Sequence, residues 1–382
     1  MNTKKTIGIA TMWDTPVNYG QVLQGFGLQT VLKDLGYNSF ILKYTGKESA
    51  IQDTLWVKIK RVLTGKRSLS DYLKRFTSKV QEDSGRHFDE FRAKYMAYSD
   101  IEYNYYSDYV NRYQKADAYI AGCDMIWCEY GSLSKKHIFL LDFLPDNIKR
   151  ISYAASFGRT EIKDSAERKV FENALPKFIA VSCREQSGKD LCIKLGRKDA
   201  EWVVDPTFLL CKKRWEEIFN LKKKKRNHKV LLAYFLTNDK ENKKLYRMMD
   251  IFRNLGYEIK YVSSTRFLDK NSNFNPTIEE WLEEMYTADM VLTSSYHGAI
   301  IALNFNTPVI SVVKGNPQEG GNVRMYSIFK RIGLEHRMIS FDNYQAIEKL
   351  EKESINWDKV NSLMDTDRLH SQKFLENALN KI

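Results

Sequence analysis

A histidine in a turn between a predicted strand and a predicted helix is the residue best placed for chemistry in this sequence. The apolar strand at 288–293 leads into the turn, and a helix follows it to Asn304. The first N–H groups of a helix are unpaired and lie at the positive end of its dipole, so the turn can bind an anion. His297 would exchange a proton with the substrate that carries this anion, unless it only caps the helix. The turn consists of Ser294, Ser295, Tyr296, His297 and Gly298.

An arginine follows another predicted strand. Arg184 comes just after the apolar segment 178–182, and a guanidinium there can hold a carboxylate or a phosphate through two parallel hydrogen bonds. The alternative is an ordinary surface salt bridge with Glu185 or Asp190. Arg184 and His297 are our two candidates for catalytic residues.

Three further predicted strand ends carry small or polar residues. The turn after the first strand contains Asn18, Tyr19 and Gly20, where the glycine lets a ligand approach the backbone closely. A helix start without any ligand explains this turn equally well. Asp124 follows the strand at 116–122 and can hold a sugar hydroxyl, and Ser156 follows the strand at 150–155.

Other signatures of catalysis are missing. The sequence has no GxxxxGK[ST] phosphate loop, no HExxH motif and no GxSxG elbow. A GxGxxG pattern that begins at Gly25 lacks its third glycine and falls inside a predicted helix, and the DTD at 365–367 lies on a polar helix. The five cysteines form no CxxC pair, and their odd number is a poor disulfide framework. We therefore expect no metal, no cofactor and a reducing, cytoplasmic environment.

A parallel sheet would bring these strand-end residues together. Strands are predicted at 6–12, 38–44, 116–122, 150–155, 178–182 and 201–204, with helices at 20–35, 164–175 and 185–195. The alternation restarts with strands at 229–236, 258–262, 289–293 and 308–312 and helices at 240–255, 277–286, 298–304, 323–332 and 357–381. We predict an α/β protein with two Rossmann-like domains facing each other across a cleft, and a ligand at the carboxyl ends of the strands.

The predicted domain boundary lies between Asp205-Pro206 and the KKKKR run at 222–226. The N-terminal domain spans 1–210, the C-terminal domain spans 225–355, and a terminal helix spans 356–382. Residues 47–105 interrupt the alternation with apolar and basic residues. This pattern predicts amphipathic helices inserted into the first domain.

Composition and charge exclude several classes of protein. The 382 residues are 43% hydrophobic, which excludes a disordered chain. No apolar run approaches the ~20 residues of a membrane span, and the start MNTKKTIGIATMWD has no apolar signal region. The net charge of +12 is concentrated at 222–226 and at 53–79, where basic and apolar residues alternate. Solvated helix faces explain such runs, and docking on an anionic membrane is the alternative for 53–79. We expect no nucleic-acid partner.

Six blocks of the sequence resemble the polysaccharide pyruvyl transferase family. They are NYGQVLQGFGLQTVLKDLGY (18–37), DAYIAGCDMIW (117–127), FLLDFLPDNIKRISYAASFG (139–158), VSCREQSG (181–188), DAEWVVDPTFLL (199–210) and ADMVLTSSYHGAIIALNFNTPVISV (288–312). Each block alone is modest, but six in the same order are specific.

The resemblance implies a fold similar to that of GT-B glycosyltransferases. It also implies transfer of the enolpyruvyl unit of phosphoenolpyruvate onto two saccharide hydroxyls, forming a cyclic ketal, in capsular or exopolysaccharide biosynthesis. The family's histidine matches His297 and its arginine matches Arg184. Some members carry a second arginine where this chain has Ser295, and Lys314 or Arg324 could supply that charge here. The implied donor-binding residues are Ser294, Ser295, Tyr296, Gly298, Lys314 and Arg324, and the implied acceptor-binding residues are Asn18, Tyr19, Gly20, Asp124 and Ser156.

Two other functions stay open. A nucleotide-sugar-dependent GT-B glycosyltransferase would use the same cleft, and a non-enzymatic protein that binds anions or membranes would depend on the basic runs alone. For the pyruvyl transferase we expect a saccharide acceptor that is lipid-linked, at the cytoplasmic face of a membrane to which residues 53–79 help to dock the protein.

Overall fold

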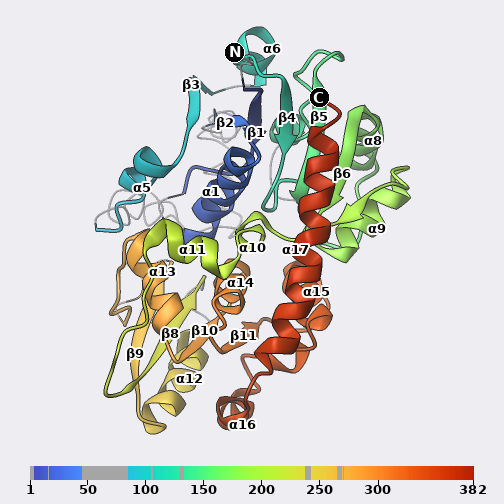
Figure 1. The fold of residues 1–382 in the computed structure, drawn as a ribbon. Coiled ribbons are helices and arrows are strands. Elements are labelled where there is room, and N and C mark those ends of the chain that lie inside the picture. Colours follow the sequence, from blue (N-terminus) through green and yellow to red (C-terminus); the bar gives the residue numbers. More distant parts are fainter. Residues whose placement is uncertain are drawn as a thin grey trace, which may run out of the picture.

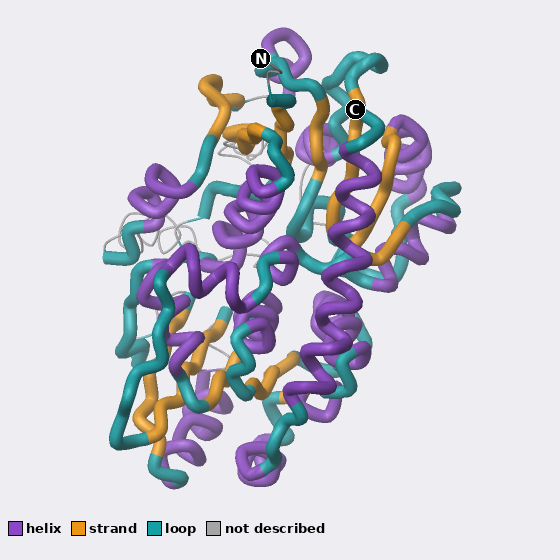
Figure 2. Tube along the Cα trace, in the orientation of Figure 1, coloured by secondary structure: helices purple, strands orange, loops and turns teal. Residues whose placement is uncertain are grey.

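Two parallel β-sheets, one in each half of the chain, form the framework of the protein (Figure 1). The structure is a computed structural model that describes residues 4–15, 17–44, 85–104, 106–128, 133–236, 242–264, 269 and 271–382. Helices cover both sheets, as Figure 2 shows. The architecture confirms the predicted α/β fold with two Rossmann-like halves.

The first sheet has seven strands within the described residues, in the order β3-β2-β1-β4-β5-β6-β7. They are β1 (Thr6–Ala10), β2 (Asn38–Tyr44), β3 (Tyr98–Tyr103), β4 (Ala118–Ala121), β5 (Lys149–Ala155), β6 (Phe178–Cys183) and β7 (Glu201–Trp202). All neighbouring strands are parallel. The strand order reverses between β1 and β4, and open α/β sheets bind ligands beyond the carboxyl ends of the strands at such a point.

Helices and turns of the first half connect these strands. The α-helices are α1 (Tyr19–Asp34), α5 (Phe88–Tyr95), α6 (Tyr106–Arg112), α7 (Leu133–Phe139), α8 (Ser165–Ala174), α9 (Gln186–Lys194), α10 (Pro206–Leu209) and α11 (Lys212–Phe219), and a 3₁₀ turn spans Leu175–Lys177. Asn18 caps α1, because its Oδ1 accepts a hydrogen bond from the Gln21 N–H at 3.2 Å. The helix ends before Gly36, whose φ of +90° favours glycine.

The second sheet has five parallel strands among the described residues, in the order β12-β11-β10-β8-β9. They are β8 (Lys229–Phe235), β9 (Tyr257–Ser263), β10 (Met290–Thr293), β11 (Val309–Val313) and β12 (Met338–Ser340). The helices are α12 (Asn242–Asn254), α13 (Ile278–Thr287), α14 (Tyr296–Asn304), α15 (Val323–Arg331) and α16 (Ile347–Lys352), with 3₁₀ turns at Gly320–Asn322, Glu335–Arg337 and Tyr344–Ala346. Here the order reverses between β8 and β10, the strand that leads to His297.

The terminal helix α17 (Trp357–Leu379) joins the two halves. Figure 1 shows it running from beside α16, in the second half, to beside β5 in the first. Ser371 Oγ accepts a hydrogen bond from the backbone N–H of Val204 at 2.9 Å, and Arg368 Nε donates to the backbone oxygen of Phe208 at 2.8 Å. One hydrophobic cluster also contains residues of both sheets, such as Ile9 and Leu232. The halves therefore pack as one continuous body.

Two edge strands were not predicted. β3 lies in the region 47–105, for which the sequence predicted helices, and β12 has three residues in a segment without a strand pattern. Helix α5 lies in the same region. The basic segment 53–79 lies outside the described residues.

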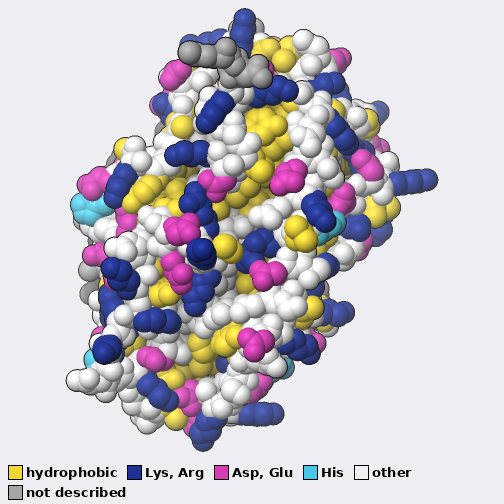
Figure 3. Space-filling model, viewed as in Figure 1, with side chains coloured by type: hydrophobic (Ala, Val, Ile, Leu, Met, Phe, Trp, Pro, Cys, Tyr) yellow, Lys and Arg dark blue, Asp and Glu magenta, His cyan; other side chains and the backbone are white. Residues whose placement is uncertain are grey.

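Basic residues of the run at 222–226 contact the second half of the protein. Lys223 Nζ donates to the backbone oxygen of Tyr286 at 2.7 Å, and Lys224 and Arg226 form ion pairs with Glu283 and Glu284 at 2.9 and 2.8 Å. On the face in Figure 3, Lys and Arg side chains are interspersed with Asp and Glu. No helix in the described ranges is both long and apolar enough to cross a membrane.

Candidate active site

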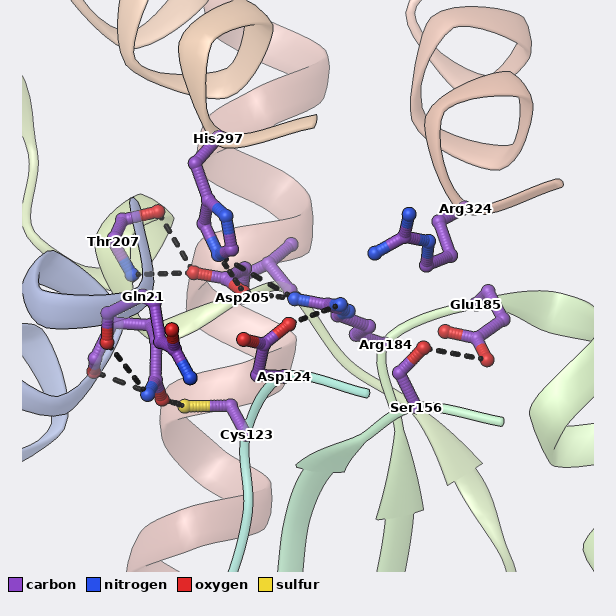
Figure 4. A network of polar contacts seen from close by, with 12 residues as sticks. Gln21, Cys123, Asp124, Ser156, Arg184, Glu185, Asp205, Thr207, His297 and Arg324 are labelled. Carbon is purple, nitrogen blue, oxygen red and sulfur yellow. Dashed lines mark hydrogen bonds and ion pairs between the residues drawn. The ribbon is translucent and has the colours of Figure 1, made fainter. Parts of the chain in front are cut away.

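Loops from both sheets meet between the two halves of the molecule (Figure 4). The residues concerned are Asp124 after β4, Ser156 after β5, Arg184 and Glu185 after β6, Asp205 after β7, His297 after β10, and Arg324 in α15. All but Arg324 follow the carboxyl end of a strand, the edge at which α/β sheets bind ligands.

Arg184 is fully buried and is paired with two aspartates. Its Nη2 donates to Asp124 Oδ1 at 3.0 Å, and its Nη1 donates to Asp205 Oδ2 at 3.1 Å. Thr207 holds the other oxygen of Asp205 through its N–H and its hydroxyl, at 3.0 and 2.8 Å. The alternative of a surface salt bridge with Glu185 or Asp190 is wrong, because Arg184 is fully buried and its guanidinium pairs with Asp124 and Asp205.

His297 reaches this cluster from the second half of the protein. Its Nε2 lies 3.4 Å from Asp205 Oδ2 and 3.4 Å from Arg184 Nη1, and the residue is 4% exposed. Asp205 can therefore orient a protonated imidazole. The ring also packs on Gly20, where a Cβ atom would lie only 2.2 Å from His297 Cγ. The group that approaches the backbone of Gly20 in this structure is thus His297.

The turn before α14 is held by hydrogen bonds of its serine hydroxyls to backbone N–H groups. Ser295 caps the helix, because its Oγ accepts a hydrogen bond from the Gly298 N–H at 3.2 Å. The Oγ of Ser294 accepts from the backbone N–H of Leu236, also at 3.2 Å. A Cβ on Gly298 would lie 2.7 Å from Thr293 Oγ1, so only glycine fits there. These residues position His297.

Arg324 supplies a cation beside His297. Its guanidinium carbon lies 5.6 Å from the centroid of the Tyr296 ring, against which Arg184 also lies at 4.7 Å. Within the described part of the chain its one hydrogen bond runs from Nε to the backbone oxygen of Gly321, at 3.0 Å. Figure 4 shows the guanidinium directed toward His297 and Arg184. Lys314, the other proposed substitute for the family's second arginine, is exposed beyond β11.

Glu185 is a fully buried carboxylate on the same side of the site as Arg324. Its Oε1 accepts three hydrogen bonds, from Ser156 Oγ at 3.1 Å and from the N–H groups of Phe157 and Gly158 at 2.9 and 3.1 Å. Its Oε2 has no hydrogen-bond partner among the described residues. The hydroxyl of Ser156 therefore helps to hold the carboxylate of Glu185 in place.

The first turn of α1 joins the two halves. Tyr19 is fully buried, donates its hydroxyl to the backbone oxygen of Pro276 at 2.7 Å, and stacks on Trp281 with ring centroids 5.0 Å apart. Asn18 caps the helix through its side chain. The three residues of the predicted turn at 18–20 thus have different places. Gly20 lies against His297, Tyr19 lies in the contact between the halves, and Asn18 caps the helix.

Burial and charge act in opposite directions on the ionised groups. Burial would raise the pKa of Asp205, but the charge of His297, a hydrogen bond to it and the charge of Arg184 hold that pKa well below its usual range. The pKa of Asp124 is likewise lowered by Arg184, against the effect of burial. Burial, followed by repulsion from Arg184, lowers the pKa of Arg324. Both aspartates are therefore ionised partners of Arg184.

Sequence reasoning missed two residues of this site. Asp205 was interpreted as part of a domain boundary, and Glu185 only as a surface partner of Arg184. The sequence signal that could have found them is the position after a strand. Asp205 follows the predicted strand at 201–204, and Glu185 is next to Arg184, which follows the strand at 178–182. The resemblance blocks VSCREQSG and DAEWVVDPTFLL also contain them.

The arrangement can perform three tasks. Arg324 and the N-terminus of α14 can bind an anion, His297 can transfer a proton, and the carboxylates can accept hydrogen bonds from hydroxyls. No group of His, Cys, Asp and Glu side chains in the described residues could hold a metal ion.

Solved structures resemble this protein in fold. A UDP-N-acetylglucosamine 2-epimerase has a TM-score of 0.56 at 10% identity, with 99% of this chain and 96% of that chain covered. The UDP-GlcNAc 2-epimerase from Methanocaldococcus jannaschii has a TM-score of 0.53 at 10% identity, covering 94% and 95%. Arabidopsis thaliana UGT89C1, solved with quercetin, has a TM-score of 0.51 at 9% identity, covering 99% of each chain. At these identities the likeness shows the two-domain, GT-B-like fold and nothing of the activity.

The sequence itself matches a family. No curated protein matches the chain, but the model of the family described as polysaccharide pyruvyl transferase matches residues 18–314. This range is most of the chain, and it includes Arg184, Asp205 and His297. The protein belongs to the polysaccharide pyruvyl transferase family.

Proposed function

We propose that this protein transfers the enolpyruvyl group of phosphoenolpyruvate to two hydroxyls of one saccharide and forms a cyclic pyruvate ketal. The observation that carries the proposal is that the guanidinium of Arg324 lies over the ring of Tyr296, the first residue of the capped helix α14, and is directed toward His297, the next residue (Figure 4). Phosphoenolpyruvate carries a phosphate and a carboxylate. A helix N-terminus and an arginine are the groups that bind such anions.

Arg324 is the better candidate for direct contact with the donor. Both terminal nitrogens of Arg184 are used by Asp124 and Asp205, whereas those of Arg324 have no hydrogen-bond partner in the described part of the chain. Arg184 would then hold Asp205, and through it the imidazole of His297.

His297 would act as the general acid. Its proton goes to the methylene carbon of the donor, which leaves positive charge at the neighbouring carbon. A saccharide hydroxyl adds to that carbon, phosphate leaves with the electrons of its C–O bond, and a second hydroxyl closes the ketal. Two hydroxyl protons are released; one replaces the proton that His297 gave, and the other leaves on phosphate. General acids of this kind contribute ~10²–10⁴-fold.

The acceptor would bind against the first half of the protein, where Asp124 and Glu185 offer oxygen atoms to hydroxyls. A saccharide that will become part of a capsular or exopolysaccharide, linked to lipid at the cytoplasmic face of a membrane, fits the family. No cofactor is needed, because the donor brings its own leaving group.

The test uses the full chain, phosphoenolpyruvate and the saccharide fraction of cells that lack the gene. Mass spectrometry should find a product heavier by pyruvic acid minus water, with release of one phosphate per product. Phosphoenolpyruvate should also raise the melting temperature. The proposal fails if UDP or GDP sugars raise the melting temperature, phosphoenolpyruvate does not, and the saccharides stay unmodified.

A further inference from the structure

We propose that Glu185 is the base that takes the proton of the attacking saccharide hydroxyl. This inference rests on the proposed function, because it assigns a role in the same reaction. It starts from the Oε2 atom of Glu185, an acceptor that is buried and without a partner among the described residues. Buried polar atoms are almost always hydrogen-bonded, so such an exception at a site points to a ligand group.

The carboxylate is held rigidly, with one oxygen left over. Three donors fix Oε1, namely the Ser156 hydroxyl and the N–H groups of Phe157 and Gly158. Figure 4 shows the other oxygen turned toward the space between Arg184 and Arg324. A base whose position is fixed by backbone groups requires no rearrangement when the hydroxyl arrives.

The other carboxylates of the site are less suitable as bases. Asp124 and Asp205 each form an ion pair with Arg184, at 3.0 and 3.1 Å. Their protonated forms are disfavoured, because the cation stabilises the charge. No Lys, Arg or His of the described residues lies within ion-pair distance of Glu185. Of the three carboxylates, Glu185 is therefore the one that forms no ion pair in the described part of the chain.

Charge also decides which substrate Glu185 faces. An anionic donor is repelled by a carboxylate, whereas a neutral hydroxyl donates a hydrogen bond to it. Arg324 and His297 come from the second half of the protein, and Glu185 comes from the first. The donor would thus lie against the second half and the hydroxyl against the first, with the reacting carbon between the two.

The proton transfers balance. The O–H bond of the first hydroxyl breaks, its proton moves to Oε2, and its oxygen forms a bond to the carbon that carried phosphate. His297 has meanwhile protonated the methylene carbon. The proton on Oε2 then leaves with phosphate, and the proton of the second hydroxyl restores His297.

The experiment compares Glu185→Gln, Glu185→Asp and Glu201→Gln in the full chain, with phosphoenolpyruvate and saccharides from cells that lack the gene. Glutamine keeps an oxygen for the three donors but cannot take a proton. We expect Glu185→Gln to lower kcat by at least ~10²-fold, without weakening phosphoenolpyruvate binding in calorimetry. Glu185→Asp should recover part of kcat. Glu201→Gln, a matched change at a carboxylate that is 41% exposed on β7, should behave like the parent.

The outcomes separate this inference from the proposed function. If the parent forms the ketal and Glu185→Gln keeps more than a tenth of kcat, Glu185 is not the base. If Glu185→Gln lowers the melting temperature and donor affinity together with kcat, and Glu185→Asp recovers nothing, its role is structural and the inference also fails. If the parent forms no ketal at all, the proposed function fails first.

Discussion

Asp205 is the residue on which the two halves of the candidate site converge. It pairs with Arg184 of its own domain and lies 3.4 Å from His297 of the other. A resemblance alone would have named the histidine and the arginine. The aspartate explains how they act together, because one of its oxygens lies within 3.4 Å of both side chains in a buried place.

Replacement of His297 tests the general acid. His297→Gln and His297→Ala should each lower the rate of transfer by at least ~10²-fold, because neither side chain delivers a proton. The glutamine variant fills most of the space beside Gly20, so its circular dichroism and melting temperature should stay close to those of the parent. A residual rate above a tenth of the parent's would contradict the assignment.

Replacement of Arg184 and of Arg324 should have different effects. Arg184→Ala leaves Asp124 without its ion pair and Asp205 with only the more distant His297, at 3.4 Å, and breaking a buried ion pair typically costs about 3–5 kcal/mol of folding free energy. If Arg184 held a carboxylate or phosphate of the donor, as its position after a strand indicates, the same change would first weaken donor binding. The structure predicts a loss of stability first, measurable by urea unfolding.

Arg324→Ala should leave stability nearly unchanged and weaken phosphoenolpyruvate binding by about 1.5–3 kcal/mol, the usual value of a hydrogen bond to a charged group. Calorimetry measures the affinity, and urea unfolding serves as the control. If Arg324→Ala binds phosphoenolpyruvate as tightly as the parent, Arg184 or Lys314 must bind the anionic groups of the donor instead.

At the scale of elements, the first turn of α1 and the first turn of α14 meet at Gly20 and His297. Each turn is held by a cap, Asn18 in α1 and Ser295 in α14. The caps fix where the helices begin, and Gly20 lets the imidazole come close to the backbone of α1.

Gly20→Ala should therefore separate the two turns. The new Cβ would overlap the His297 ring, so either the ring or a whole domain must shift. A misplacement of about 1 Å can cost ~10²-fold in rate, so we expect a loss of that order with little change in helix content. Small-angle scattering should show a larger radius of gyration if the domains open. A variant as active as the parent would show that this contact is not needed for catalysis.

At the scale of the molecule, buried side chains join the two halves. Tyr19, Trp281 and Pro276 form one such contact, and α17 adds another along its length. The site is buried where the halves meet, with Arg184 and Asp205 almost fully covered.

Membrane docking is the prediction that concerns the molecule as a whole. We expect the full chain to sediment with anionic vesicles at low salt, because several basic residues at 53–79 each contribute about 1 kcal/mol near an anionic surface. Added salt should release it, since it screens these charges. Neutral vesicles are the control. Equally weak binding to both kinds of vesicle would contradict membrane docking. It would not bear on the proposed pyruvyl transfer.

The sequence by itself determined most of the strands and the family. Strand β2 was predicted to the residue, and the alternation of strands and helices was found in both halves, because hydrophobic periodicity is a local property of the chain. The strands β3 and β12 escaped prediction, since β3 (YSDIEY) is largely polar and β12 has only three residues, so neither gives a clear hydrophobic period.

Only the tertiary structure decided which side chains meet. Arg184 lies 60 residues from Asp124, 21 from Asp205 and 113 from His297 along the chain. No local pattern encodes such pairings. They follow from the strand order of two sheets and from the packing that brings the carboxyl ends of both to one place, which also leaves one oxygen of Glu185 unpaired among the described residues.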